Sequence, residues 1–219
     1  MEESTPKEKI LKRIRQALLY KSKNPYANID LESGVFTKDS RDLRVQFATQ
    51  FTAAAGHFVY CENEFDYMDN LLTIIGERSI SKIFCNETKL VNEFDDIGLE
   101  FTSSVENLMK TDAAITSCES LQARTGSILL SSRKNGRLPS ISSPVHFVKA
   151  YTSQLVPDMR DSLLLLKNKY GSNLPSMLCY AAGPSRTSDI ERTLVIGAQG
   201  PKEVFLLLIE DQSHPKLDS

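Results

Sequence analysis

Between residues 41 and 102 the chain alternates helical segments with short apolar runs, and this alternation limits the possible folds more than any other feature. Residues 41–55, 65–77 and 88–94 each place apolar side chains on one helical face. Residues 57–61 and 82–85 are apolar runs of strand length, and residues 99–102 are a third strand candidate. Strands that alternate with helices predict right-handed βαβ units around a mostly parallel sheet, and therefore an α/β fold.

The pattern changes after residue 112. Residues 113–118, 127–131, 138–141 and 146–150 are four strand candidates with almost no helix between them, and Asn135-Gly136 is the strongest turn signal in the chain. We then expect a helix over residues 156–170, a strand over 177–181, a helix over 188–196 and a final strand over 204–209. This half is predicted to add short strands beside one another.

The first forty residues look like an appendage. Residues 7–20 carry an apolar stripe between lysines and arginines, which predicts an amphipathic helix that docks on the body or on a partner. Residues 22–40 are polar and contain few core residues, as linkers do. We therefore divide the chain into an arm and linker (1–40), an α/β domain (41–210) and a polar tail (211–219).

Composition narrows the functional classes. A formal net charge of −2 provides no strong field for nucleic acid or an anionic membrane. The N-terminus opens with acids and lacks the apolar core of a signal peptide, so we expect a cytoplasmic protein. The four cysteines show no C-x-x-C spacing and the three histidines have no metal-type spacing, so we expect the chain itself to bind no metal or iron–sulfur cluster.

Residues 183–191 form the most informative polar segment, because they follow an apolar strand and precede the predicted helix. Such a junction would place backbone N–H groups and the positive end of a helix at the carboxyl edge of a sheet, where open α/β sheets bind ligands. Ser185 and Thr187 add hydroxyl groups, and Arg186 adds a fork that matches a carboxylate or phosphate. An ordinary helix cap, with Asp189 in the first turn, is the alternative.

A second polar segment lies at the entry of the strand at 127–131. Gly126 permits close backbone approach there, and the hydroxyls of Thr125 and Ser127 can contact a ligand. Glu119 follows an apolar strand and is a candidate general base or nucleophile. His146 can face the same edge as Thr125, although a structural role is favoured for all three histidines, least clearly for His146. A simple polar turn is the alternative reading of this segment.

Several motifs, taken in order, resemble one known family, the lactate-utilization C or LUD domain family. They are Thr125-Gly126-Ser127, Asn135-Gly136-Arg137-Leu138, Pro144-Val145-His146, Val156-Pro157-Asp158, Gly183-Pro184-Ser185-Arg186-Thr187-Ser188-Asp189-Ile190-Glu191 and Gly197-x-x-Gly200-Pro201. The resemblance covers about residues 112–210. It implies a fold like the NagB/RpiA/CoA-transferase group and adds Gly183, Arg137 and Asp189 to the ligand-binding candidates. Arg124 departs from the family pattern, in which an acidic residue precedes the Thr-Gly pair.

The resemblance also implies a function: oxidation of L-lactate to pyruvate beside an iron–sulfur subunit and a second cysteine-rich subunit, with this chain binding a small anionic ligand. Two other classes remain open. The chain can be a stand-alone enzyme that acts on a phosphosugar or an acyl-CoA, with Glu119 as base or nucleophile. It can also be a non-catalytic module whose N-terminal helix binds a partner, and a homo-oligomer is compatible with each class.

Overall fold

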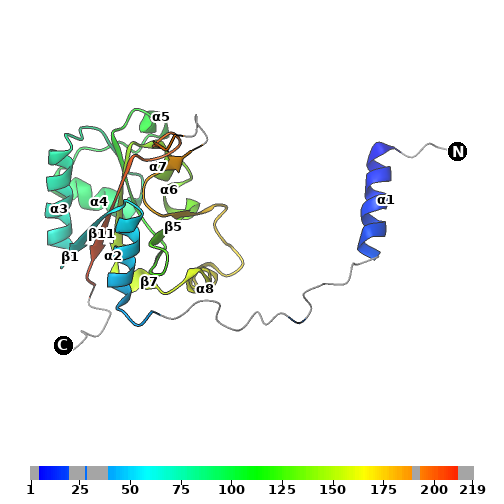
Figure 1. The fold of residues 1–219 in the computed structure, drawn as a ribbon. Coiled ribbons are helices and arrows are strands. Elements are labelled where there is room, and N and C mark those ends of the chain that lie inside the picture. Colours follow the sequence, from blue (N-terminus) through cyan, green and yellow to red (C-terminus); the bar gives the residue numbers. More distant parts are fainter. Residues whose placement is uncertain (1–4, 20–27, 29–38, 189–192, 212–219) are drawn as a thin grey trace. The chain divides into compact units, whose positions relative to one another are not determined.

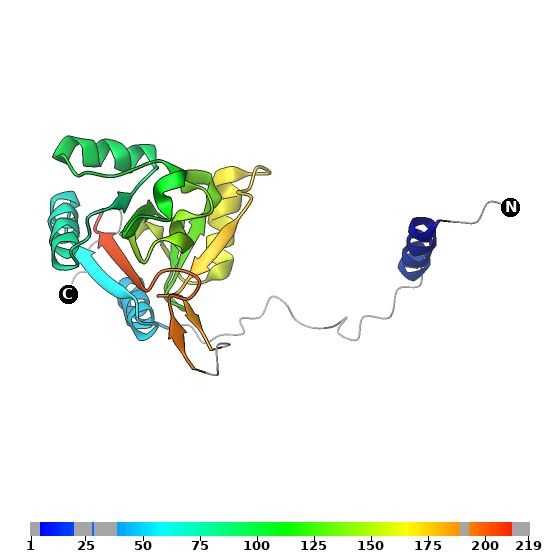
Figure 2. The same cartoon turned by 90° about the horizontal axis from the view of Figure 1, so that it is seen from above.

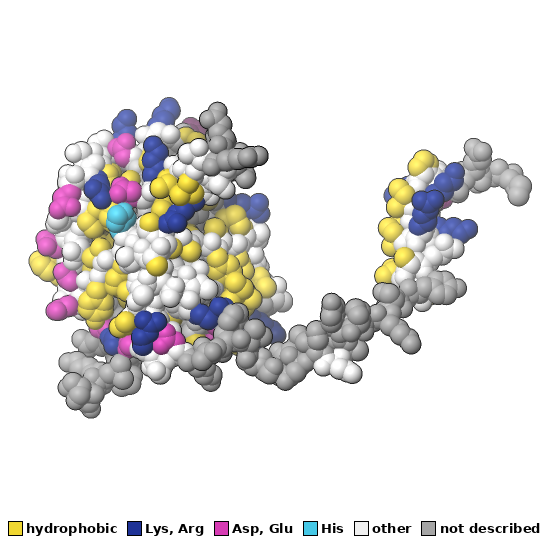
Figure 3. Space-filling view, in the orientation of Figure 1, with side chains coloured by type: hydrophobic (Ala, Val, Ile, Leu, Met, Phe, Trp, Pro, Cys, Tyr) yellow, Lys and Arg dark blue, Asp and Glu magenta, His cyan; other side chains and the backbone are white. Residues whose placement is uncertain are grey.

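The computed structural model describes residues 5–19, 28, 39–188 and 193–211. The chain divides into two compact units, Met1–Ser40 and Arg41–Ser219, which are described separately. In the first unit, helix α1 (Pro6–Leu19) has no buried residue. Its hydrophobic side chains gather on one side and its lysines and arginines on the other (Figure 3), so the predicted amphipathic helix is confirmed. Most of the predicted linker lies outside the described residues.

A five-stranded sheet forms the centre of the second unit (Figure 1). In chain order its strands are β1 (His57–Cys61), β2 (Ile83–Phe84), β3 (Ala113–Ser117), β6 (Val145–Tyr151) and β11 (Glu203–Ile209). They lie in the order β1-β11-β6-β3-β2, and every neighbouring pair is parallel. The predicted parallel sheet is therefore confirmed, with β11 inserted between β1 and β6.

Helices cover one face of this sheet. Helix α3 (Glu64–Glu77) and helix α4 (Thr88–Ile97) pack their buried side chains against alternate residues of β3, β6 and β11. Alternation along the strands assigns Phe147 to this face and Val148 to the other. The short helix α5 (Val105–Leu108) precedes β3.

The opposite face is covered by helix α2 (Leu43–Ala53) and by a second, four-stranded sheet. The strands of that sheet, in spatial order, are β7 (Leu155–Val156), β4 (Ser120–Gln122), β5 (Ser127–Ser131) and β8 (Leu178–Ala181). A 3-10 turn, η1 (Thr152–Gln154), links β6 to β7, and helix α8 (Met159–Tyr170) packs against β4 and β7. Of the short strands that the sequence predicts, β5 and β8 lie in this second sheet, whereas the candidates at 113–118 and 146–150 become β3 and β6 of the central sheet. Strands β4 and β7 were not predicted.

Two predicted strands are wrong. Residues 138–141 belong mostly to helix α7 (Pro139–Ser142), and helix α6 (Ser132–Asn135) precedes it, so helices do separate the strands of this half. Pro139 stands at the start of α7, where its fixed φ favours a helix and its missing N–H costs nothing. Residues 99–102 contribute only one bridge, between Thr102 and Phe84.

The predicted helix over residues 188–196 is also wrong where the structure describes it. Strand β9 (Arg186–Thr187) pairs antiparallel with β10 (Val195–Ile196), and the two project from the body (Figure 2, orange). Residues 189–192 lie outside the described residues. The β-branched side chains of Thr187, Val195 and Ile196 favour the extended backbone that is observed.

Candidate functional site

A pocket of about 430 Å³ opens where β3 and β6 end, at the carboxyl edge of the five-stranded sheet. We call it the carboxyl-edge pocket. Its lining residues are Glu87, Thr88, Lys89, Leu90, Glu93, Ser117, Lys149, Tyr151, Gln154 and Lys169. The volume lies within the range of about 300–1,000 Å³ that is usual for small-molecule sites. Open α/β sheets bind ligands at this edge, so position and size make it the candidate site.

Lys149 forms the floor of the pocket and is only 2% exposed. Its Nζ lies 2.8 Å from a Glu64 oxygen and 2.7 Å from a Glu93 oxygen, and 4.6 Å and 5.6 Å from the ring centres of Tyr67 and Tyr151. Burial alone would lower the pKa of Lys149, but the hydrogen bonds to the two carboxylates outweigh it and raise the pKa. The ammonium therefore stays charged and joins β6 to α3 and α4.

Glu87 stands at the N-cap of α4 yet makes no capping hydrogen bond with its side chain. The carboxylate instead accepts from the backbone N–H of Ser117 at 2.7 Å and from its hydroxyl at 2.5 Å. The start of α4 therefore faces the pocket, and the Glu87 side chain caps none of its first N–H groups.

Glu119, the predicted base or nucleophile, lies just past β3 and is buried. One carboxylate oxygen accepts from the hydroxyls of Ser131 at 2.6 Å and Tyr170 at 2.8 Å. The other accepts from Lys169 at 2.7 Å, and Lys169 lines the carboxyl-edge pocket. Glu119 is thus held next to the pocket wall, with both oxygens engaged.

The two polar segments singled out from the sequence do meet, on helix α2. Antiparallel pairing of β5 with β8 places residues 125–127 beside Gly183, which follows β8. A Cβ on Gly126 would overlap the backbone of Phe51, and a Cβ on Gly183 would overlap the carbonyl oxygen of Ala54. Both glycines have positive φ, 61° and 72°. We call this contact region the α2 junction.

The polar groups of the α2 junction donate to the protein itself. The Thr125 hydroxyl donates to Ser127 Oγ at 2.9 Å, and the Ser185 hydroxyl to the carbonyl of Gln199 at 2.8 Å. The Arg186 guanidinium donates to the carbonyl of the α2 C-cap. All three side chains were predicted to receive a ligand, and in the structure those of Ser185 and Arg186 hold separate backbone segments together.

The α2 junction also lies at the other edge of the central sheet from the one predicted. The backbone N–H of Ser185 donates to the carbonyl of Pro201 at 2.9 Å, and Pro201 lies just before the start of β11. Gly183 lies next to Gly56, which precedes β1. Because all five strands are parallel, both contacts place the junction at the amino edge. Where a helix start was expected, the described residues Arg186 and Thr187 form strand β9.

The remaining predicted ligand residues are dispersed. His146 is buried, its Nε2 lies 2.9 Å from the Thr116 hydroxyl, and burial lowers its pKa to about 4, so the ring is neutral. Arg137 donates to the hydroxyl of Ser176, near the end of β5 that is remote from residues 125–127. Asp189 lies outside the described residues.

Arg124, the departure from the family pattern, forms a two-pronged ion pair with Asp158. Its Nε and Nη2 lie 3.0 Å and 2.7 Å from the two carboxylate oxygens. Asp158 is the N-cap of α8 and accepts from the N–H of Met159. The arginine thus fixes the start of α8 beside the second sheet.

Sequence reasoning missed the carboxyl-edge pocket. One signal was present: Lys149 is the single cation in the apolar run of β6, and a lysine is almost never fully buried unless it is paired. Glu87 and Glu93 gave no signal, because carboxylates on a helix usually face water. Only the arrangement of α4 against β3 and β6 brings them together.

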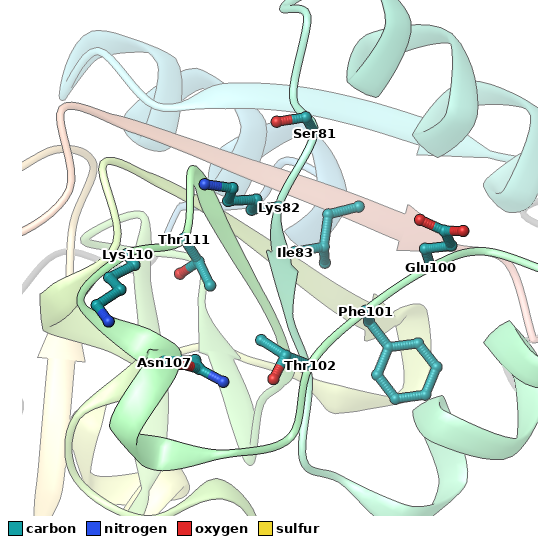
Figure 4. A pocket seen from close by; sticks show the side chains of 9 residues that line it. All are labelled: Ser81, Lys82, Ile83, Glu100, Phe101, Thr102, Asn107, Lys110 and Thr111. Carbon is teal, nitrogen blue, oxygen red and sulfur yellow. The ribbon is translucent and has the colours of Figure 1, made fainter.

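Two further pockets open at the amino edge. The one in Figure 4 has a volume of about 330 Å³. Its lining residues are Ser81, Lys82, Ile83, Glu100, Phe101, Thr102, Asn107, Lys110 and Thr111. The other, of about 300 Å³, is lined partly by Gly197 and Gly200. Among the described residues, no group of three or more His, Cys, Asp or Glu side chains could hold a metal ion, and no helix could cross a membrane.

Comparison with known families gives one match, to the LUD domain, over residues 45–209. Curated relatives include the lactate utilization protein C of Bacillus licheniformis, 32% identical over 49% of this chain and 47% of that protein. The protein of the same name from Halalkalibacterium halodurans is 34% identical over 49% of this chain and 48% of that protein. In both, the chain spans about half of the relative's length.

A longer match, to the lactate utilization protein C of Bacillus velezensis, is 26% identical over 74% of this chain and 71% of that protein. A crystal structure of a DUF162 family protein from Deinococcus radiodurans aligns with a TM-score of 0.58, covering 76% of this chain and 96% of the other. At 16% identity, that likeness concerns the fold alone.

Proposed function

Because the chain belongs to the LUD domain family, we propose that it serves in lactate utilization, as an accessory subunit of a system that oxidises L-lactate to pyruvate. The observation that carries this proposal is that relatives at 32% and 34% identity bear the name lactate utilization protein C. The family match extends over residues 45–209, which include every strand of the central sheet.

We propose further that electron transfer depends on iron–sulfur partner subunits and that this chain contributes a site for a small anionic ligand. The four cysteines lie on separate elements, which supports a division of labour in which the redox centres belong to partners. The lysines and carboxylates of the carboxyl-edge pocket support a polar, charged ligand.

Deletion of the gene in its native host tests the proposal. The deletion strain should fail to grow on L-lactate as sole carbon source, grow normally on pyruvate, and recover on L-lactate when the chain is supplied from a plasmid. Affinity purification of the full chain should recover proteins that contain iron and acid-labile sulfide. Normal growth of the deletion strain on L-lactate would refute the function, and purification without such proteins would refute the partnership.

A further inference from the structure

The carboxyl-edge pocket has hydrogen-bond donors that the protein does not use. Lys89 lies in the first turn of α4, and its side chain makes no hydrogen bond or ion pair with any other described residue. Lys169 reaches the pocket from α8, is half exposed, and gives one of its three protons to Glu119. The first residues of α4 also line the pocket, and the Glu87 side chain caps none of their N–H groups. Together they give the pocket several hydrogen-bond donors that are open to solvent, beside the carboxylates of Glu87 and Glu93.

A buried hydroxyl beside the pocket also lacks a partner. The oxygen of Tyr67 is buried and has no hydrogen bond to any described residue, while the Lys149 ammonium lies 4.6 Å from the centre of its ring. Burial raises the pKa of the Tyr67 phenol, and the nearby carboxylate of Glu93, which lines the pocket, raises this pKa further. Buried polar groups nearly always have a hydrogen-bond partner, so this hydroxyl favours the binding of a water or ligand beside it.

The pocket also provides an acceptor. Glu93 uses one carboxylate oxygen for Lys149, and its other oxygen has no hydrogen bond within the described residues. Donors and an acceptor that line the same hollow suit a ligand with a carboxylate and a hydroxyl. They suit a bare inorganic anion less well, because Glu93 would repel it.

We propose that the carboxyl-edge pocket, rather than the α2 junction, is the ligand site of this domain, and that it takes a short 2-hydroxy carboxylic acid. The carboxylate lies between Lys89, Lys169 and the start of α4, and the hydroxyl donates to Glu93. The choice of acid class rests on the proposed function, whereas the location rests on the contacts described above. A three-carbon acid fills only part of the 430 Å³, so the rest of the hollow is open to water or to a partner.

Calorimetric titration of the full chain with L-lactate tests the site, with propionate and inorganic phosphate as comparison ligands. Propionate lacks the hydroxyl and should bind about fivefold or more weakly. The variants Lys89→Ala and Lys169→Gln should each weaken L-lactate binding about tenfold, since a hydrogen bond to a charged group is lost. Lys110→Ala, at an exposed lysine of the amino-edge pocket in Figure 4, is the matched control and should bind as the wild type does.

Three results would overturn the site: no saturable binding of L-lactate, equal weakening by Lys110→Ala, or binding of propionate and phosphate as tight as that of L-lactate. Circular dichroism and the thermal midpoint of each variant separate misfolding from a lost contact. If the deletion strain fails to grow on L-lactate but the titrations show no binding, the proposed site is wrong and the proposed function stands. If L-lactate binds here but the deletion strain grows normally, the function is wrong and the site stands.

Discussion

The α2 junction and the carboxyl-edge pocket lie at opposite edges of the same sheet and come from different kinds of sequence. The junction is made of two short motifs rich in glycine and hydroxyl residues, whereas the pocket is made of single charged residues from separate elements. At the junction the polar groups bind other parts of the chain, and at the pocket several donors face solvent. A dense motif can therefore mark close packing of backbone, while a binding surface is assembled from scattered residues.

The largest effect on stability should come from Gly183 of the α2 junction. Gly183→Ala combines a positive φ with overlap against Ala54, and we expect it to lower the free energy of unfolding by about 3–4 kcal/mol. Gly98→Ala is the control: its φ of 71° matches the 72° of Gly183, but nothing lies within 4 Å of the added Cβ. That variant should lose only about 1 kcal/mol. Urea denaturation measures both, and equal losses would show that close packing is not what the junction requires.

His146 sharpens the comparison, because it was predicted as a ligand residue and is buried instead. Its pKa of about 4 lies below the ordinary value of 6.5, so the unfolded chain binds the proton first as the pH falls. The contribution of His146 to the free energy of unfolding is fully present above pH 6.5. It is lost as the pH falls from 6.5 to 4, by about 3 kcal/mol over that window.

Unfolding curves at several pH values should give a shallower decline for His146→Gln, which can keep a hydrogen bond to Thr116. Parallel declines for the variant and the wild type would contradict the assignment of His146 as a buried, neutral side chain.

Lys149 tests the floor of the pocket. Lys149→Met removes the ammonium and leaves two carboxylates without their shared partner. Because those carboxylates are part exposed, we expect a loss of about 1–2 kcal/mol rather than the cost of a fully buried pair. The pKa of Lys149 is raised. Its contribution to the free energy of unfolding is therefore complete at neutral pH and declines only when the pH rises above 10.5, the ordinary pKa of lysine.

The matched control is Lys167→Met, an exposed lysine on α8, which should change stability by less than about 0.5 kcal/mol. Thermal unfolding at pH 7 compares the two, and a Lys149 variant as stable as the control would show that the network is dispensable.

The smallest effect should come from Arg186. Arg186→Gln removes an exposed guanidinium that donates to a backbone carbonyl, so we expect a loss below about 1 kcal/mol and unchanged L-lactate binding. A tenfold loss of L-lactate affinity in this variant would return the ligand site to the α2 junction.

Local patterns predict most of the central sheet and its helices. Helix α3 and strands β1, β6 and β11 can be predicted from local sequence. Each has a buried face, so its apolar residues recur with the period of a helix or fill a run of strand length. The segments whose prediction failed lack such a face. Residues 138–141 carry a proline at a helix start, and residues 195–196 form a two-residue strand whose pairing with β9 is not encoded locally. The pocket could not be derived, since Glu87 and Lys169 meet only through the order of the strands.

The central position of β11 has a consequence for synthesis. Residues 203–209 leave the ribosome after every other strand of the five-stranded sheet, yet they separate β1 from β6 and pair with both. Until they emerge, β1 has no neighbour in the sheet. The unpaired edge of β6 also stays open to association with other nascent chains. The domain must therefore complete its fold after translation of this segment, and earlier stages are where a chaperone would be needed.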